Sequence, residues 1–252
     1  MNSQERVATN LRTLLILEAV ARHDRPVTPT EINHDIGLPK QSIHRLCQTL
    51  VEEGFLIRDI NGKRLQAAPR TMNMARALTT SRHTNIARRQ VLTSVSAVTG
   101  ETVNFVVPEP DGMTYLDRVE TDWIFRIELP IGSRVPFYCT ASGKCYLSSL
   151  DDKQFDTLVN TIDYEQRTPA TITNSKQLKV EIELTRKRGY AIDNEELFRG
   201  MIALAVPIKD ENGRFLAALA FHGPTQRLSS DTLVEHLDTM NDAAAKIAGL
   251  HR

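Results

Sequence analysis

Apolar residues recur at helical spacing in two successive stretches between Thr28 and Gly54, which predicts a helix, a short turn and a second helix. The first helix starts at Thr28 and Glu31, whose side chains can cap it reciprocally, and it is expected to run to about Ile36. Gly37 then supplies a turn conformation that other residues resist. This layout is typical of a helix-turn-helix motif.

The second helix is expected to begin near Pro39 and to have two contrasting faces. Its apolar stripe, which must pack against a core, consists of Ile43, Leu46, Cys47 and Leu50. Its opposite face carries side chains that can donate hydrogen bonds, namely Lys40, Gln41, His44, Arg45 and Gln48. Apolar and polar residues then alternate over Phe55–Asp59, ahead of Asn61-Gly62, a dipeptide suited to a two-residue hairpin turn. The sequence therefore predicts a winged helix-turn-helix, with Lys63 and Arg64 just beyond the tip of the wing.

This arrangement is suited to gripping duplex DNA, because a helix can read base edges in the major groove while cations on a wing approach phosphate. The side chains predicted at the groove are Gln41, Ser42, His44 and Arg45. Those predicted on phosphate are Lys40, Lys63 and Arg64. A small helical bundle with a hairpin, used for protein contacts, is the alternative that the same pattern allows.

Two further helices are predicted around this motif. One covers Leu11–Arg22 and would complete a three-helix core through Leu14, Leu17 and Val20. The other covers Arg70–Leu78, as a connecting helix, and the polar residues 79–85 follow it as a break. The boundaries expected are 1–70 for a DNA-binding domain, 71–84 for a linker helix and 85–252 for a second domain.

The remaining residues predict a domain in which helices cover a mostly antiparallel sheet, so the fold class expected for the chain is α+β. The expected strands are Thr102–Val107, Met113–Val119, Ile124–Leu129, Tyr190–Asp193, Ile202–Ile208 and Phe215–His222. The expected helices are Ile86–Val98, Thr140–Ser149, Asp151–Asn160, Ser175–Arg188 and a final helix with Leu233, Leu237, Met240, Ala244 and Ile247 along one face. Asp111-Gly112 and Asn212-Gly213 are expected to turn two of the strand pairs.

Charge is distributed unevenly along the chain. Over 252 residues, 31 basic and 31 acidic side chains cancel. Residues 1–89 hold 14 Lys and Arg against 8 Asp and Glu, a net charge of +6, which leaves 17 against 23, a net charge of −6, for the rest. Such asymmetry indicates an end that faces nucleic acid and a separate acidic body.

Composition limits the class of protein further. A hydrophobic content of 41% can fill two ordinary domains, and the longest apolar run, Met201–Ile208, is too short to span a bilayer. The three cysteines, Cys47, Cys139 and Cys145, have no metal-type spacing and fit a reduced cytoplasm. We therefore expect a cytoplasmic protein with no membrane segment, no metal site and no cofactor.

Several segments resemble, in order and separation, the IclR family of bacterial transcriptional regulators. Besides the winged module, they are Phe137–Lys144, Gly189–Glu196 and the stretch from Gly200 through Pro207 to Gly223-Pro224. The resemblance implies a winged-helix DNA-binding domain, a linker helix and a GAF-like domain that binds a small organic acid from a catabolic pathway. It also implies a dimer or a dimer of dimers on a palindromic operator, and no enzymatic activity.

An effector site is implied by the same resemblance. Thr140, Ala141, Ser142 and Gly143 match the segment whose backbone N–H groups hold an effector carboxylate in the family, and a helix start offers unpaired donors to an anion. Asp193 matches an aspartate that lines the same cavity. The alternative for Asp193 is a residue at a strand end that satisfies local backbone groups.

Three positions depart from those of family members that bind very small keto acids, in which one is often cysteine and two are serine. Here these positions are Ala203, Ala220 and His222. The loss of a thiol and two hydroxyls disfavours glyoxylate or pyruvate and favours a larger carboxylate, for example an aromatic one. His222 would then donate to a ring substituent or a second acid group, and the alternative is a satisfied histidine at a strand end.

Two other classes of function are compatible with parts of the sequence. A thiol-based redox sensor or reductase on the GAF-like domain would use Cys139 and Cys145, with His222 as base. A protein-interaction module would not bind DNA. A regulator in which the ligand changes DNA affinity through the helix at Arg70–Leu78 accounts for both halves of the chain.

Overall fold

Three clusters of buried hydrophobic side chains organise the described residues, one in the first part of the chain and two in the second. The structure is a computed structural model that describes residues 8–23, 25–79, 82–124 and 129–250. It divides into two compact units, residues 1–81 and 82–252.

The first unit is a three-helix motif followed by a hairpin and one more helix. In chain order its elements are a 3-10 turn η1 Thr9–Leu11, α1 Arg12–Ala21, α2 Pro29–Ile36, α3 Lys40–Glu52, β1 Leu56–Arg58, β2 Leu65–Ala67 and α4 Pro69–Thr79. The predicted capping box is present at α2, because Glu31 N donates to Thr28 Oγ1 at 3.2 Å and Thr28 N donates to Glu31 Oε2 at 2.7 Å. Gly37 ends α2 in the left-handed conformation, with φ 70°. These features confirm the predicted helix-turn-helix.

Two predictions for this unit are wrong in detail. Leu14 does not pack into the core, since it is 57% exposed, and Ile16 and Ala19 are buried instead. Seven of the ten residues of α1 are apolar, so spacing alone does not identify its buried face. The wing also turns more widely than the predicted two-residue hairpin: its last bonded pair is Asp59–Arg64, and the Asp59 carboxylate accepts from the N–H groups of Lys63 and Arg64.

The second unit is built on one six-stranded antiparallel sheet, which confirms the predicted α+β class. Its strands are β3 Thr102–Glu109, β4 Gly112–Val119, β5 Arg134–Val135, β6 Ala191–Asn194, β7 Met201–Lys209 and β8 Phe215–Pro224. They lie in the order β5-β4-β3-β8-β7-β6, so β3 and β8, which are far apart in the sequence, are neighbours at the centre.

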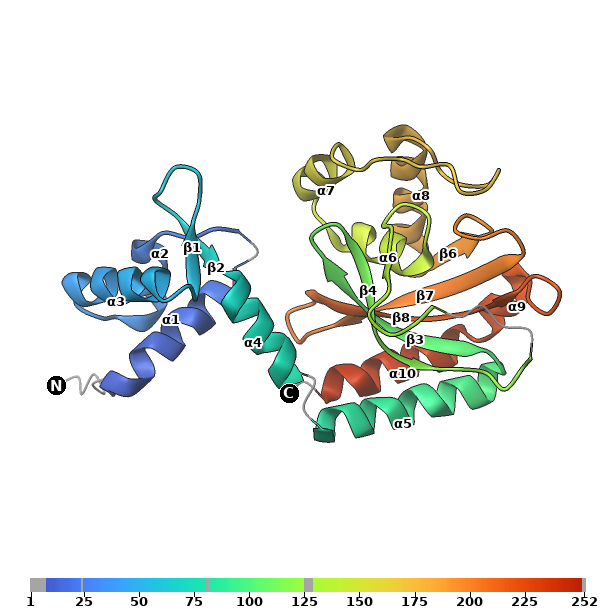
Figure 1. The fold of residues 1–252 in the computed structure, drawn as a ribbon, viewed down its shortest axis with the longest axis horizontal. Helices are drawn as coiled ribbons and strands as arrows, with labels where there is room; N and C mark the ends of the chain where they lie inside the picture. Colours follow the sequence, from blue (N-terminus) through green and yellow to red (C-terminus); the bar gives the residue numbers. More distant parts are fainter. Residues whose placement is uncertain (1–7, 24, 80–81, 125–128, 251–252) are drawn as a thin grey trace. The chain divides into compact units, whose positions relative to one another are not determined.

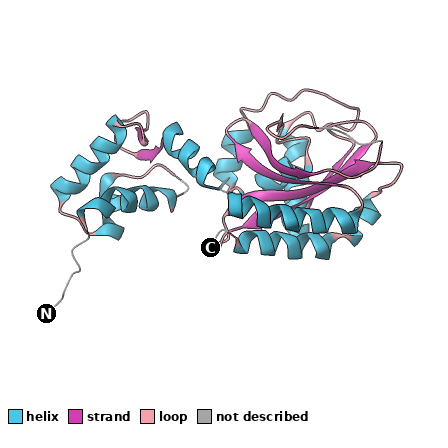
Figure 2. Cartoon of the chain, turned by 60° about the horizontal axis from the view of Figure 1, so that its bottom comes forward, coloured by secondary structure: helices cyan, strands magenta, loops and turns pink. Residues whose placement is uncertain are grey.

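Helices cover both faces of this sheet (Figures 1 and 2). One face is packed by α5 Arg82–Thr99, α9 Ser230–Glu235 and α10 Leu237–Gly249. On the other face α6 Ala141–Ser149 lies against the strands, and α7 Asp152–Val159 and α8 Ser175–Arg188 complete the same hydrophobic cluster. Strand residues alternate between the two layers, so that Val103 and Phe105 face α5 and α10 while Val106 joins the core beneath α6.

Three further predictions need correction, and a fourth lies mostly outside the described residues. The polar break is mostly helical, because α4 reaches Thr79 and α5 already begins at Arg82; weak helix propensity is overridden by the surrounding fold. The single final helix is two helices that meet at His236, whose ring packs edge-on against Phe221. The turn between β3 and β4 is Pro110-Asp111, because proline presets the first turn position. Of the expected strand Ile124–Leu129, residues 125–128 lie outside the described residues, and neither flanking residue is in a strand.

Candidate nucleic-acid interface and ligand cavity

Helix α3 presents the predicted polar row to solvent. Its buried stripe is formed by Ile43, Cys47 and Leu50, with exposed fractions of 0%, 1% and 6%. The opposite side carries the exposed side chains Lys40, Gln41, His44 and Arg45, and the half-buried Ser42. The five residues predicted from the sequence for this helix therefore share one accessible surface.

The two predicted wing cations differ in their surroundings. Lys63 is exposed near the hairpin tip. Arg64 is also exposed, but its guanidinium donates to Pro26 O at 3.0 Å and lies 3.6 Å from the carboxylate of Glu31. Arg64 thus ties the wing to the start of α2, and a phosphate would have to compete with these contacts.

Arg58 is a further basic residue at this surface, and the sequence analysis missed it. It lies on β1 and donates to Gln48 Oε1 of α3 at 2.7 Å and to Gly62 O of the wing tip at 2.9 Å. These two bonds hold the wing next to the exposed row of α3. Its position among the alternating residues before the wing turn was the available signal.

A small buried cavity lies between the start of α6 and the sheet. It is lined by Asn104, Tyr115, Thr140, Ala141, Ser142, Asp193, Leu197, Met201, Ala203, Ala220 and His222. Seven of the eight predicted effector residues are among them, and Gly143 is not. The free volume is about 20 Å³, roughly the room for one water molecule, so an aromatic acid fits only if lining side chains move.

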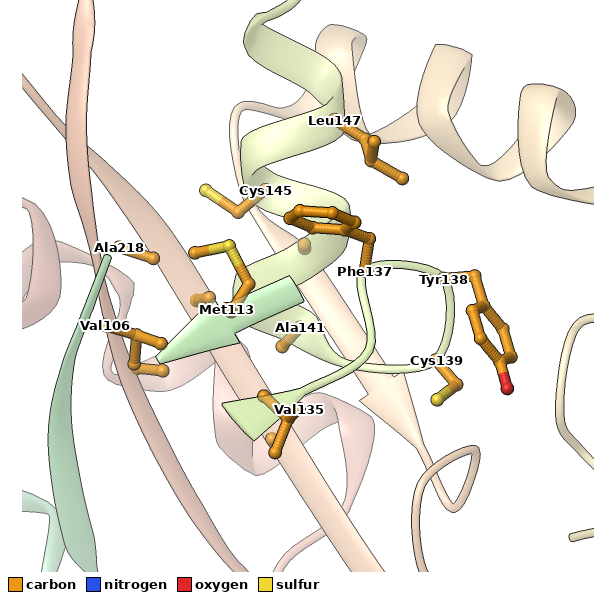
Figure 3. Close-up of a cluster of buried hydrophobic side chains, with 14 of the residues drawn as sticks. Val106, Met113, Val135, Phe137, Tyr138, Cys139, Ala141, Cys145, Leu147 and Ala218 are labelled. Atoms are coloured by element: carbon orange, nitrogen blue, oxygen red, sulfur yellow. The ribbon is translucent and has the colours of Figure 1, made fainter. Parts of the chain in front are cut away.

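Thr140 caps the start of α6, and this cap explains why Gly143 offers no free N–H group to the cavity. Thr140 Oγ1 donates to Pro136 O at 2.7 Å and accepts from Gly143 N at 3.0 Å, so the Gly143 N–H is already bonded. A Cβ at Gly143 would lie 2.3 Å from Phe137 O, which shows that glycine is needed for packing here. Figure 3 shows Phe137 beside this turn of α6. The N–H groups of Ala141 and Ser142, at the first two helical positions, have no acceptor within the helix.

Asp193 lines the cavity and also satisfies local backbone groups. Its Oδ1 accepts from Glu196 N at 2.7 Å and from Leu197 N at 3.4 Å. Burial, with a smaller contribution from Glu196 and against the attraction of Lys144, raises the pKa of Asp193 to about 7. Asp193 is therefore both a residue of the cavity wall and an acceptor for local backbone groups, as the two interpretations of the sequence expected separately.

A buried ion pair supports the loop that follows Asp193, and the sequence analysis did not identify it. Lys144 of α6, 1% exposed, bonds Glu196 Oε1 at 2.5 Å and lies 3.4 Å from Glu181. Burial raises the pKa of Glu196, although Lys144 opposes the shift. The pair joins α6 to the loop after β6, so it holds the two protein segments that meet at the cavity.

Comparisons with known proteins agree with this two-part organisation. Residues 11–59 match the family described as the IclR helix-turn-helix domain, and residues 76–249 match the C-terminal domain of bacterial transcriptional regulators of the IclR type. The chain is 34% identical to the probable transcriptional regulator SauR of Cupriavidus necator, over 94% of both sequences. The chain belongs to the IclR family.

Two further relatives of this IclR-family protein show how widely the likeness extends. The transcriptional repressor IclR of Escherichia coli is 29% identical over 89% of this chain and 82% of its own length. The crystal structure of the Thermotoga maritima IclR, at 27% identity, superposes with a TM-score of 0.64 and covers 96% of this chain and 97% of its own. The protein is thus a transcriptional regulator with a DNA-binding helix-turn-helix and a C-terminal effector-binding domain.

The thiols of this IclR-family chain are poorly placed for redox chemistry. Cys139 and Cys145 are buried, and burial raises the pKa of each to about 12. Reactive cysteines need the thiolate, which is scarce at neutral pH for such groups. The redox alternative therefore gains no support.

Neither a metal site nor a membrane span is found in the part of the chain that the structure describes. Within it, no group of three or more His, Cys, Asp or Glu side chains could hold a metal ion. Its helices are each too short or too polar to cross a membrane.

Proposed function

We propose that this protein binds operator DNA through α3 and the wing, and that a small organic acid in the cavity controls this binding. The genes controlled would belong to a catabolic operon. The observation that carries the DNA part is the exposed row of donors on α3 beside a basic wing. In this proposal residues 1–70 contact DNA, residues 71–84 link the domains and residues 85–252 bind the ligand and form the oligomer.

Each residue of the DNA surface has a distinct proposed task. Gln41, Ser42, His44 and Arg45 read base edges in the major groove, while Lys40 and Lys63 contact phosphate. Arg64 reaches phosphate only after leaving Pro26 and Glu31, so its contribution is the smallest of the cations. Arg58 positions the wing through Gln48 and Gly62.

Binding measurements on a fragment of the gene's own upstream region test these tasks. If Arg45 reads a guanine, Arg45→Ala should cost about 1 to 3 kcal/mol and relax specificity at one base pair. Lys63→Ala should weaken binding to all sequences and reduce the salt slope by about one unit. An unchanged salt slope in Lys63→Ala, or unchanged specificity in Arg45→Ala, would contradict the docking.

The ligand site proposed is the cavity beneath α6. A carboxylate would accept from the N–H groups of Ala141 and Ser142, where the positive end of the helix dipole adds to the attraction. Ala203 and Ala220 offer no hydrogen bonds, which disfavours very small keto acids. Calorimetry with aliphatic and aromatic acids on wild type and His222→Ala tests the site, and unchanged binding of every ligand would remove His222 from it.

The assembly proposed is a dimer, or a dimer of dimers, on a palindromic operator. Two winged helices related by a two-fold axis read two half-sites, so the spacing of half-sites reports the geometry of the pair. Light scattering of the free protein and of its complex with operator DNA gives the number of chains. A single chain bound to a single half-site would exclude this arrangement.

A further inference from the structure

Asn104 is a buried side chain that the proposed function has not yet used. It lies on β3 and is 0% exposed. Together with Ala220 and His222 of β8 it lines the sheet side of the cavity, whereas the start of α6 forms the helix side. Its Nδ2 lies 3.1 Å from His222 Nδ1, so the imidazole holds the amide in place.

The remaining polar atom of this amide is unsatisfied. Asn104 Oδ1 is buried and has no hydrogen-bond partner among the described residues. In the strand ladder Asn104 is paired with the apolar Ala220 of β8 and, on its other side, with Arg118 of β4, whose guanidinium donates to Leu129 O. Buried amide oxygens in proteins nearly always have a donor, so an exception inside a cavity points to a ligand that supplies one.

The chemistry of this atom selects the kind of ligand group. A carboxylate has only acceptors and cannot donate to an amide oxygen, whereas a hydroxyl can. If the amide is turned over, the atom left without a partner is the Nδ2 donor, and a hydroxyl can accept from it. A hydroxyl matches both orientations, while a carboxylate or an ammonium matches only one. A hydroxyl occupies about the space of one water molecule, which is about the 20 Å³ of the cavity, so the rest of the acid is accommodated only when lining side chains move.

We infer that Asn104, held by His222, is the residue that determines ligand specificity, and that the ligand is a carboxylic acid bearing a hydroxyl group. This inference rests on the proposed function, because the carboxylate is taken to bind Ala141 and Ser142. The hydroxyl bonds to Asn104 at the sheet side of the cavity. The same acid without its hydroxyl leaves the Asn104 amide unsatisfied and therefore binds more weakly.

Calorimetry on the full chain with matched pairs of acids tests the inference. The pairs are glycolate and acetate, 3-hydroxypropionate and propionate, and 4-hydroxybenzoate and benzoate. In the pair whose length fits, the hydroxy acid is expected to bind wild type about tenfold more tightly than its partner. Asn104→Leu, which is close to isosteric, should abolish this preference by weakening the hydroxy acid alone. Ser142→Ala, a control at the carboxylate end that keeps the backbone N–H groups, should keep the preference for the hydroxy acid.

The possible failures are distinguishable. If the Asn104→Leu variant does not fold, Asn104→Ala takes its place in the comparison. The preference of the wild type for the hydroxy acid is measured without any variant. Equal binding of both members in every pair that binds, or a preference that survives in the Asn104 variants, would overturn the role of Asn104 and leave the effector site standing. If the wild type binds no member of any pair, the proposed effector site and this inference both fail.

Discussion

Replacing Asp193 by asparagine should stabilise the protein, and by more as the pH rises. Asp193 is 1% exposed, and burial first, then Glu196, raises its pKa from 3.8 to about 7. Between these two pH values the folded protein keeps a proton that the unfolded chain has lost, so wild type loses stability as the pH rises. Asparagine keeps an acceptor for the N–H groups of Glu196 and Leu197 and has no charge to bury.

The magnitude follows from the shift in pKa. The pKa of Asp193 rises from 3.8 to about 7, which corresponds to about 4 kcal/mol of unfolding free energy. This value is the upper limit for the increase in stability that Asp193→Asn gains over wild type between pH 4 and pH 8. Urea unfolding followed by tryptophan fluorescence measures this gain, because Trp123 is the one tryptophan of the chain and lies in the same unit as Asp193. The two proteins should differ least near pH 4 and most near pH 8.

A matched control separates this effect from a general consequence of removing a carboxylate. Asp163 is exposed in the same unit, and Asp163→Asn should change stability by no more than about 0.5 kcal/mol at any pH. A difference between wild type and Asp193→Asn that stays constant from pH 4 to pH 8, or that shrinks as the pH rises, would refute the reasoning.

Three other predictions concern packing, capping and thiol chemistry. Gly143→Ala should lower the urea midpoint, at a cost of about 1 to 3 kcal/mol, because its Cβ would meet the Phe137 backbone. Gly249→Ala, with nothing within 4 Å of the new Cβ, is the control and should not destabilise. Glu31→Gln should lower the melting temperature at pH 7. Hydrogen bonds from Thr28 and Arg25 lower the pKa of Glu31 from 4.5 to about 2. The stabilisation that the Glu31 carboxylate provides is therefore lost as the pH falls from 4.5 towards 2, so the difference between the two proteins should fade on acidification. Circular dichroism at pH 7 and pH 3 measures this, and a loss that grows on acidification contradicts it. Cys139 and Cys145 should resist alkylation by iodoacetamide in the folded protein at pH 8, because burial raises the pKa of each thiol to about 12. Rapid labelling of either cysteine in the native protein, detected by mass spectrometry, would disprove that these thiols are unreactive.

Local signals accounted for most of the fold. Three features of the first unit are each formed by residues only a few positions apart, so the sequence displays them directly. They are the capping box at Thr28 and Glu31, the αL glycine at Gly37 and the buried stripe of α3. Strand-like runs likewise indicated five of the six strands of the sheet, and the two-residue strand β5 was missed. Where local signals were ambiguous the prediction failed, as on α1, where a run of apolar residues concealed that Leu14 faces solvent.

The cavity was predictable only in part. Seven of its lining residues followed from a resemblance to family motifs, but Asn104 did not, because nothing in the sequence of β3 distinguishes it from the other polar residues there. Its role depends on His222, which is 118 positions away and becomes a neighbour only when β3 pairs with β8. The same holds for Lys144, whose partner Glu196 comes from another element. Pairs formed by tertiary structure leave no local pattern in the sequence.

Nuclease protection of the gene's own upstream region tests the central claim most directly, namely that α3 and the wing bind a specific DNA sequence. Wild type should protect one discrete site at moderate salt, and Arg45→Ala should lose that protection at the same protein concentration. If wild type protects no site at low ionic strength, with or without organic acids, or if Arg45→Ala protects the same site equally well, the account is contradicted.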